Sequence, residues 1–308
     1  MFKIESHGSE RIGLMVDIGA AGDFMAGHAR PLDRRRFGVV IHGDPPEGAL
    51  AALSAYRNPD GGYGWGLEPD LRSTTSQPGP ALHAFEVFED ILPATTPAAV
   101  ELCDWLGSVT LPDGGVPFAL PIDDGAASAP FWVNADPAES SLQITAIVTA
   151  NAQRVAAQDD AVASHEWLAR ATEYGINAIG ALQRQPQTLE LAFSVQFLDA
   201  AYERHPRAEE MLRKLAEYIP DTGLVPVTGG IEGETMKPLD FAPFPDRPTR
   251  ELFSPGVIEK DLERLAGEQR EDGGWEVDFA SYSPAASLEW RGHATVRAVT
   301  ILKKNSML

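Results

Sequence analysis

The chain has 308 residues, of which 44% are hydrophobic and 23% are charged, a composition typical of a soluble globular protein. The formal net charge of -20 argues against nucleic acid and anionic membrane surfaces as partners, because both are themselves negative. Cys103 is the only cysteine, which excludes an intramolecular disulfide and a zinc site made of several thiolates. We therefore expect a cytoplasmic protein.

No composition break divides the chain, so we expect a single domain over residues 1–308. Charged side chains interrupt the first fourteen residues, which predicts no signal peptide, and no apolar stretch is long enough for a membrane span. Within the domain we expect residues 1–46 to be an N-terminal extension that packs on the rest. Residues 225–254 are rich in proline, glycine and acidic residues and are expected to form a loop insertion.

Apolar residues recur at helical spacing over most of the chain. We expect helices over 47–56, 80–92, 97–109, 140–156, 165–183, 188–202, 208–219, 257–269 and 291–303. The best strand signal is the short G-V-V-I-H run at residues 38–42. The pattern therefore predicts an all-α protein built from helical hairpins.

A turn with an aspartate and glycines recurs between these helices, at intervals of about fifty residues or twice that. Its aspartates are Asp60, Asp113, Asp221 and Asp272. Such an interval fits two helices with their loops. Turn aspartates usually bond their own backbone, so we expect Asp60, Asp113 and Asp272 to be structural. Helices after the turns are apolar on more than one side and those before them more charged, which suits an inner and an outer ring.

Residues 269–275 read Q-R-E-D-G-G-W and match the Q-x-x-x-G-x-W turn of squalene–hopene and oxidosqualene cyclases. Residues 60–82, D-G-G-Y-G-W and then S-T-T-S-Q-P-G-P-A-L, also resemble a cyclase repeat. From about residue 47 onward, the chain therefore resembles the terpenoid cyclase/protein prenyltransferase superfamily, and within it short bacterial prenyltransferase-like proteins. The resemblance implies an α/α toroid, an α6–α6 barrel of roughly six hairpins with a central hydrophobic cavity. In the turn, the glutamine is expected to cap a neighbouring helix and the aromatic residue to seal the hairpin.

The motifs that carry the superfamily's chemistry are missing from this chain. Neither D-x-D-D nor D-D-x-x-D occurs, and Cys103 follows Glu101 where a prenyltransferase zinc site has an Asp-x-Cys pair. We therefore expect no metal and no cofactor, with Cys103 as a buried structural residue.

The densest polar cluster, at residues 68–74, follows the first turn. If the segment is extended, Glu68, Asp70 and Arg72 share one face. A carboxylic acid in apolar surroundings has a raised pKa and can act as a general acid, so we expect Asp70 or Glu68 in that role. Arg72 is expected to bind a carboxylate or phosphate of the substrate. The alternative is a salt-bridged loop that anchors the next helix.

A second cluster lies in the equivalent place after the second turn. Trp132 is expected to line the cavity or to stabilise a cation through its ring, with Asn134 and Asp136 as polar contacts. The alternative is an N-cap run for the next helix, with Ser140 or Ser141 as the cap.

A third cluster precedes the last helix. Glu289 and His293 are four residues apart, so on a helix they share a face and form a candidate acid–base pair, while Trp290 lines the pocket. His293 lacks the partners of a zinc site, and a hydrogen-bonded core histidine is its alternative. His83 and Trp65 complete the expected substrate contacts, although His83 can equally be a packed residue. The basic run at 34–36 is expected on a solvated or salt-bridged face.

These residues lead to a first hypothesis, an enzyme that cyclises or isomerises a hydrophobic isoprenoid-type substrate after protonating it. A non-catalytic protein that binds a lipid-like or peptide ligand is the second, and a carbohydrate-active enzyme on the same toroid is the third. A carboxylic acid in the wall of a cavity without water would favour the first hypothesis over the second. An open groove lined with aromatic side chains would favour the third. The oligomeric state is left open.

Overall fold

Residues 16–308 are described by the structure, a computed structural model, and within this range the chain forms fourteen α-helices and one pair of short antiparallel strands. The predicted all-α class is therefore confirmed. The hydrophobic core has two parts, and α7 contributes buried side chains to both of them.

The helices are α1 (Ile18–His28), α2 (Pro31–Phe37), α3 (Glu47–Leu53), α4 (Pro78–Asp90), α5 (Pro97–Val109), α6 (Pro130–Val133), α7 (Leu142–Val155), α8 (Asp160–Ala163), α9 (Glu166–Ala181), α10 (Thr188–Ala201), α11 (Ala208–Ala216), α12 (Pro238–Phe241), α13 (Pro255–Gly267) and α14 (Pro284–Lys304). The remaining elements are the π-helical turn η1 (Gly38–His42), the 3₁₀ turns η2 (Ser54–Tyr56) and η3 (Pro248–Leu252), and the strands β1 (Val225–Pro226) and β2 (Thr235–Met236).

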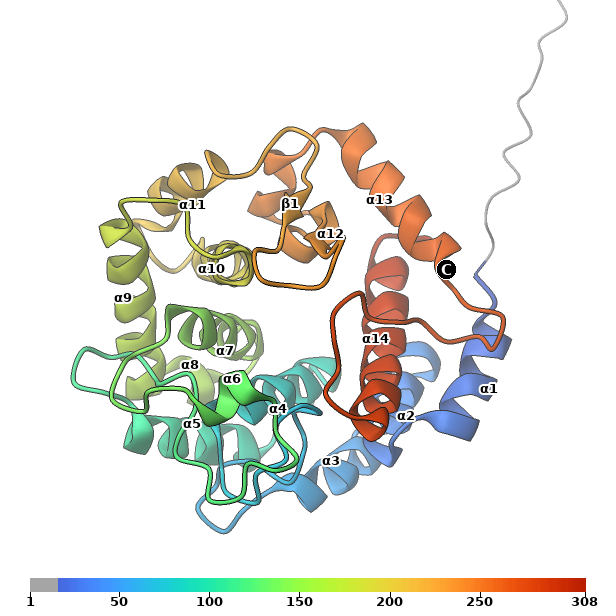
Figure 1. The fold of residues 1–308 in the computed structure, drawn as a ribbon, viewed down its shortest axis with the longest axis horizontal. Coiled ribbons are helices and arrows are strands. Elements are labelled where there is room, and N and C mark those ends of the chain that lie inside the picture. The colour runs from blue at the N-terminus through green and yellow to red at the C-terminus, as the bar shows by residue number, and fades with distance from the viewer. Residues whose placement is uncertain (1–15) are drawn as a thin grey trace, which may run out of the picture.

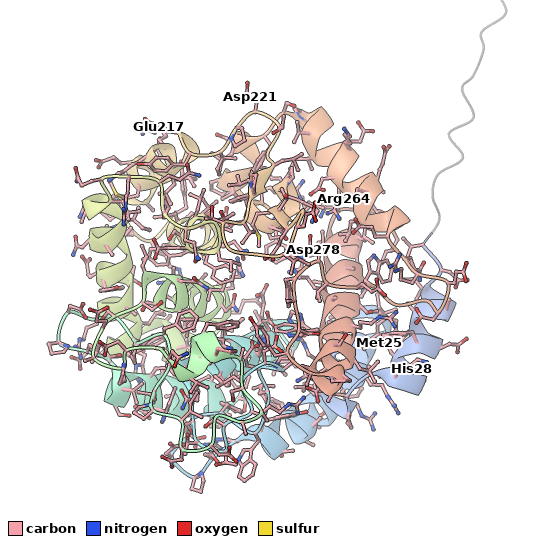
Figure 2. The ribbon with its side chains drawn as sticks, viewed as in Figure 1. Met25, His28, Glu217, Asp221, Arg264 and Asp278 are labelled. Atoms are coloured by element: carbon pink, nitrogen blue, oxygen red, sulfur yellow. The ribbon has the colours of Figure 1, made fainter. Side chains whose placement is uncertain are left out.

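The helices lie around a common centre, with α1, α3, α9, α11 and α13 at the periphery and α4, α7, α10, α12 and α14 inside them (Figure 1). Helix α7 packs against both α4 and α10, while α14 contacts α1 and α2 from the opposite end of the chain. Side chains of the inner helices project into the central space, whereas Glu217 and Asp221 lie on the outer edge (Figure 2).

The two predicted helix classes are confirmed by burial. Helix α7 is buried almost all round, and Ser141 caps it by accepting a hydrogen bond from the amide of Ile144. The peripheral helix α13 buries a single stripe, which includes Ile258, Leu262 and Leu265. A helix apolar on all sides needs protein on all sides, which is why the helices after the turns lie inside.

The three turn aspartates predicted to be structural bond the backbone of their own turns, which confirms that role. The bonds run from Gly62 N to Asp60 Oδ1 at 3.0 Å, from Gly115 N to Asp113 Oδ1 at 3.2 Å, and from Gly274 N to Asp272 Oδ1 at 3.2 Å. In each turn, the glycine just before this amide donor has a positive φ, a conformation that favours glycine; these residues are Gly61, Gly114 and Gly273.

The positive-φ glycine of each turn also packs against the backbone of a peripheral helix. A Cβ on Gly61 or Gly114 would lie 2.9 or 3.0 Å from a carbonyl oxygen of α5 or α9, respectively. A Cβ on Gly273 would lie 2.0 Å from the carbonyl oxygen of Ala20 in α1. Helix α1 therefore packs against the last turn in the same way as α5 and α9 pack against the first two turns. The described part of the expected N-terminal extension thus supplies a peripheral helix of the same arrangement.

Side chains of the last turn reinforce this contact. Gln269 accepts a hydrogen bond from Asp17 N at 2.8 Å and donates one to Asp17 O at 2.8 Å, and Asp17 is the N-cap of α1. The indole of Trp275 donates to the carbonyl oxygen of Leu265 in α13 at 2.7 Å. The glutamine cap on a neighbouring helix and the aromatic seal are both confirmed here.

One local prediction is wrong. Residues 38–42 do not form a strand but continue α2 as the π-helical turn η1, which ends at Gly43 with a φ of 70°. The β-branched run was too short to override the helical hydrogen bonds that extend from α2. Residues 225–254, expected as a loop insertion, contain the short elements β1, β2, α12 and η3 between irregular segments.

The contact between the last turn and α1 predicts the effect of a single methyl group. Gly273→Ala places a Cβ against the backbone of α1 at a φ of 91°, so we expect the free energy of unfolding to fall by about 2 kcal/mol or more. Gly256→Ala is the matched control, because a Cβ there meets nothing within 4 Å. Urea denaturation measures both, and equal effects of the two substitutions would contradict the proposed contact.

Candidate functional site

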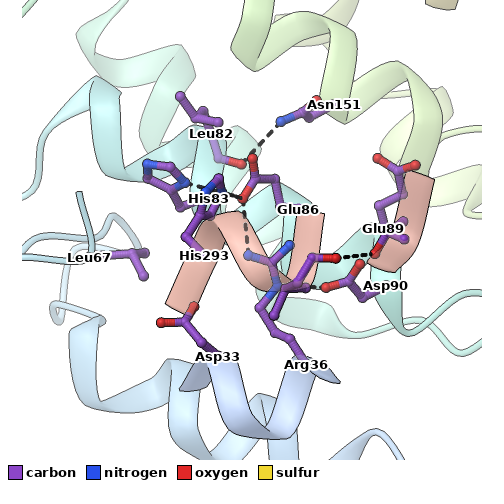
Figure 3. A network of polar contacts seen from close by, with 12 residues as sticks. Asp33, Arg36, Leu67, Leu82, His83, Glu86, Glu89, Asp90, Asn151 and His293 are labelled. Carbon is purple, nitrogen blue, oxygen red and sulfur yellow. Dashed lines mark hydrogen bonds and ion pairs between the residues drawn. The ribbon is translucent and has the colours of Figure 1, made fainter. Parts of the chain in front are cut away.

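A buried network of charged side chains converges on one carboxylate oxygen, Glu86 Oε2 (Figure 3). This oxygen lies 3.2 Å from His83 Nδ1, 2.9 Å from His293 Nε2 and 3.2 Å from the guanidinium of Arg36. His83 and Glu86 are three residues apart on α4, which places them on one face, whereas His293 comes from α14 and Arg36 from α2. Three helices from distant parts of the chain therefore build this centre.

Arg36 ties α2 to α4 through two carboxylates. Its Nε donates to Asp90 Oδ2 at 2.6 Å, in addition to the contact with Glu86 one turn earlier on α4. Burial raises the pKa of Asp90 to about 6, although Arg36 opposes that shift. Figure 3 shows Arg36 reaching from α2 towards both acids.

The other nitrogen of His83, Nε2, lies 2.7 Å from Glu68 Oε2, and both side chains are buried. Burial alone lowers the pKa of His83, but Glu86 and Glu68 outweigh it and raise that pKa to about 9. Burial raises the pKa of Glu86, yet the imidazoles of His293 and His83 bring it well below its ordinary value. The pKa of His293 is lowered, because burial outweighs the attraction of Glu86. Near neutral pH, His83 therefore carries a proton and His293 does not.

Asp70 lies beside this network and is only 4% exposed. Leu67 and Leu71, close to it in the sequence, are fully buried. Its Oδ1 accepts a hydrogen bond from the amide of Tyr282 at 2.8 Å, and its Oδ2 accepts one from the indole of Trp290 at 2.7 Å. Burial raises the pKa of Asp70, and these two donors only partly oppose the rise.

Trp290 connects the two parts of the site. Its ring centroid lies 5.8 Å from that of His83, 5.4 Å from that of His293 and 5.1 Å from that of Phe279, all edge-on. The first and third sequence clusters, although far apart in the chain, therefore meet in one place.

Arg72 and Glu289 also meet at this place, and they form an ion pair between the first cluster and α14. Glu289 and His293 thus bond to different partners, Arg72 and Glu86, and not to each other as an acid–base pair. Both members of the Arg72–Glu289 pair keep part of their surface accessible.

The remaining candidates lie outside this cluster. Trp65 is 53% exposed and donates its indole hydrogen bond to Asn58. Asn134 and Asp136 are exposed, and Asp136 accepts a hydrogen bond from the amide of Ala138 in its own turn. These contacts fit the alternative of a run that leads into α7, whose cap is Ser141. Trp132 is buried against Phe118, with ring centroids 4.5 Å apart.

Three residues at the centre of the network were not predicted from the sequence. Glu86 carries a local signal, since His83 and Glu86 form an H-x-x-E pair at helical spacing on a predicted helix. Arg36 was expected on a solvated or salt-bridged face, and it is salt-bridged but buried. Its partner Asp90 has no distinguishing signal, because the ion pair joins residues from different helices. Cys103 is fully buried, as predicted, and burial raises the pKa of its thiol to about 12.

Charged side chains also line the inner helices beyond this cluster. Glu89 on α4 lies 3.9 Å from Arg154 on α7 and 3.5 Å from Lys304 on α14. Arg154 donates to Gln196 on α10 at 3.1 Å. A separate open hollow of about 300 Å³ is lined by Pro112, Asp113, Gly114, Ala169, Arg170 and Glu173, and none of the predicted site residues lies in it.

Comparison with protein-family models and with curated proteins gives no match to this chain. Within residues 16–308, no helix is both long enough and apolar enough to cross a membrane.

Glu86 is the carboxylate on which the network depends. Glu86→Gln keeps the shape of the side chain but leaves the buried cations Arg36 and His83 without their shared anion. We expect the free energy of unfolding to fall by about 3 kcal/mol, the lower end for a broken buried ion pair, because Glu86 retains some exposure.

The matched control is Glu209→Gln, which removes the same charge from an exposed pair with Arg213 on α11. That pair is expected to contribute less than about 1 kcal/mol. Urea denaturation of both variants at one pH provides the comparison. A loss at Glu86 no larger than the loss at Glu209 would mean that the network does not stabilise the fold.

Proposed function

We propose that this protein is an enzyme that acts on a hydrophobic, isoprenoid-type substrate by proton transfer from Asp70. The observation that carries the proposal is the position of Asp70, a buried carboxyl group with a raised pKa that accepts a hydrogen bond from the indole of Trp290. A carboxylic acid in such surroundings stays protonated at higher pH than an exposed one and can act as a general acid.

We also propose that the helices form an α/α toroid of the kind found in the terpenoid cyclase/protein prenyltransferase superfamily. Two features support this: peripheral and inner helices surround a common centre, and α1 packs against the last turn of the chain. The glycine turns shared with cyclase repeats are a further point of support. Because one fold hosts many reactions, the chemistry has to be argued from the site itself.

Glu68 is the less suitable of the two predicted proton donors, because its carboxylate is already bonded to His83 at 2.7 Å. Among the described residues, no cation lies at a comparable distance from Asp70, and its two donors are an amide and an indole. Each oxygen of Asp70 accepts one of these bonds and keeps a lone pair for the proton.

In the proposed reaction, protonated Asp70 transfers its proton to one carbon of an alkene, and the electron pair of the double bond forms the new carbon–hydrogen bond. The other carbon is left as a cation, and Asp70 becomes a carboxylate that the amide of Tyr282 and the indole of Trp290 stabilise. Aromatic faces stabilise such a cation. Loss of a proton from a neighbouring carbon then restores a double bond, and the released proton returns to Asp70 directly or through water.

The substrate would approach from the side where aromatic rings are accessible. Phe131 and Tyr282 are each about half exposed, and their ring centroids lie 5.5 Å apart. The backbone amide of Tyr282 bonds Asp70, so the exposed ring of Tyr282 belongs to a residue that contacts the acid. Arg72, which pairs with Glu289, is the cation available for an anionic group of the substrate.

A carbohydrate-active enzyme is the second candidate, and one observation favours it. The inner helices carry charged side chains, among them Glu89 and Arg154, where an isoprenoid cavity would be apolar. A polar substrate bound there would use Trp65, Phe131 and Tyr282 as exposed stacking surfaces.

The acid role predicts the effect of one substitution. Asp70→Asn removes the transferable proton and keeps the shape, so turnover of linear terpenes and prenyl diphosphates should fall by about 10²- to 10⁴-fold. Products are followed by gas chromatography with mass spectrometry. Asp136→Asn, at an exposed turn, should leave the rate unchanged.

Wild-type protein that converts none of these compounds would contradict the isoprenoid hypothesis. Turnover of an oligosaccharide panel by the same preparation would support the second candidate instead. The choice of compounds is guided by solvent extraction and native mass spectrometry of the purified protein, which would detect a bound lipid-like molecule.

The hydrogen bond from Trp290 predicts a shift in pH dependence. A proton donor works in its acid form, so kcat/KM should fall as the pH rises through the raised pKa of Asp70. Of the groups that face Asp70, the donors Tyr282 and Trp290 and the charge of Arg72 lower this pKa, whereas Glu68 raises it. Trp290→Phe removes one lowering contribution, so the falling limb should move to higher pH.

Trp132→Phe is the control for that experiment, because the indole nitrogen of Trp132 has no hydrogen-bond partner in the described residues. Its pH profile should coincide with that of the wild type. A falling limb that stays in place or moves to lower pH in Trp290→Phe would rule out Asp70 as the group that titrates.

A further inference from the structure

We propose that His83, Glu86 and His293 form a binding site for a divalent metal ion of the zinc type. Each residue offers one ligand atom, and the three atoms all lie within 4.8 Å of one another. The proposal concerns residues other than Asp70, so it stands or falls independently of the proton-transfer function.

The distances between the ligand atoms suit a small tetrahedral ion. His83 Nδ1 and His293 Nε2 lie 3.2 and 2.9 Å from Glu86 Oε2. Zinc binds nitrogen and oxygen ligands at about 2.0–2.1 Å in a tetrahedron, which places ligand atoms about 3.3 Å apart. The two nitrogen–oxygen distances are therefore within a few tenths of an ångström of the tetrahedral separation, and the two nitrogens lie within 4.8 Å of each other.

The chemical types of the ligands also fit. Two imidazoles and one carboxylate are a common ligand set for zinc in catalytic sites, where a water or substrate atom takes the fourth position. The Glu86 side chain keeps 21% of its surface accessible, so a fourth ligand can approach. No thiolate is needed, which matters because Cys103 is buried on another helix.

Neighbouring side chains already orient these ligands. Glu68 lies 2.7 Å from His83 Nε2 and accepts the hydrogen on that nitrogen, so the proton that the ion displaces is the one on Nδ1. A carboxylate behind a metal-binding histidine commonly serves this purpose. Arg36 donates to the same oxygen of Glu86 and thereby fixes the position of this carboxylate.

The charge of the surroundings favours a cation. Three carboxylates, those of Glu68, Glu86 and Asp90, face two cations, the guanidinium of Arg36 and the protonated imidazole of His83. Binding of a divalent ion would release the second proton of His83, and the ion together with Arg36 would then balance the three carboxylates. The proposal departs from the expectation of no metal, which rested on missing sequence motifs. His293 lies 207 residues from Glu86, so no motif could have shown this set.

Cobalt titration of the full-length protein, after removal of bound metal with a chelator, tests the site. We expect one equivalent of Co²⁺ to bind with the strong visible absorption of a tetrahedral complex, and Zn²⁺ to displace it. His83→Gln and His293→Gln should each weaken binding by more than about 100-fold, and Glu68→Gln by about 10- to 100-fold.

Two matched variants complete the test. His205→Gln removes another histidine that pairs with a carboxylate, Glu173, and should bind as the wild type does. Asp70→Asn should also bind normally, which separates failure of this site from failure of the acid role. Circular dichroism checks that each variant is folded.

X-ray absorption at the zinc edge of the loaded wild-type protein needs no variant. The proposal requires two imidazole ligands and light-atom ligands at tetrahedral distances. Absence of stoichiometric binding, a zinc shell without two imidazoles, or unchanged affinity in both folded histidine variants would each overturn it.

Discussion

The packing of turn glycines against the backbone of peripheral helices is the constraint on which the rest of the structure depends. Gly61 and Gly114 fix α5 and α9 in this way, and Gly273 fixes α1. Because α1 precedes α2 directly, the last contact also brings α2 beside α14 and close to α4. The site therefore exists only when both ends of the described chain are in place.

Glu86 shows what this arrangement makes possible. Its carboxylate receives a guanidinium from α2 and imidazoles from α4 and α14, so one anion joins three helices. A buried carboxylate with so many partners is costly to desolvate, and cations around it have to compensate. Asp70, in contrast, is buried with an amide and an indole as its only donors among the described residues. Glu86 and Asp70, which belong to one site, thus have opposite pKa shifts, and such a difference is the usual basis for dividing acid and base roles.

The sequence predicts features that depend on neighbouring residues better than features that depend on residues far apart in the chain. Helices, turn aspartates and the glutamine cap depend on local spacing, and the structure confirms them. Periodicity and composition also identified Asp70, His83 and His293 as candidates, but not their partners, because the pairs join residues from different helices. Glu86 carried only the local H-x-x-E signal, and its pairing with Arg36 became visible only once α2 and α4 were packed. The strand expected at 38–42 was wrong for a related reason, since the end of α2 decides its conformation.

A carbon-13 NMR titration of the aspartate carboxyl groups tests the central claim, that Asp70 is the acid of the site, most directly. The account predicts that Asp70 titrates clearly above the ordinary value of 3.8 and that Trp290→Phe raises its pKa further. The exposed Asp136 provides an internal reference in the same spectra. An Asp70 that titrates at or below its ordinary value would be ionised at neutral pH, and the proposed proton transfer would then have no donor.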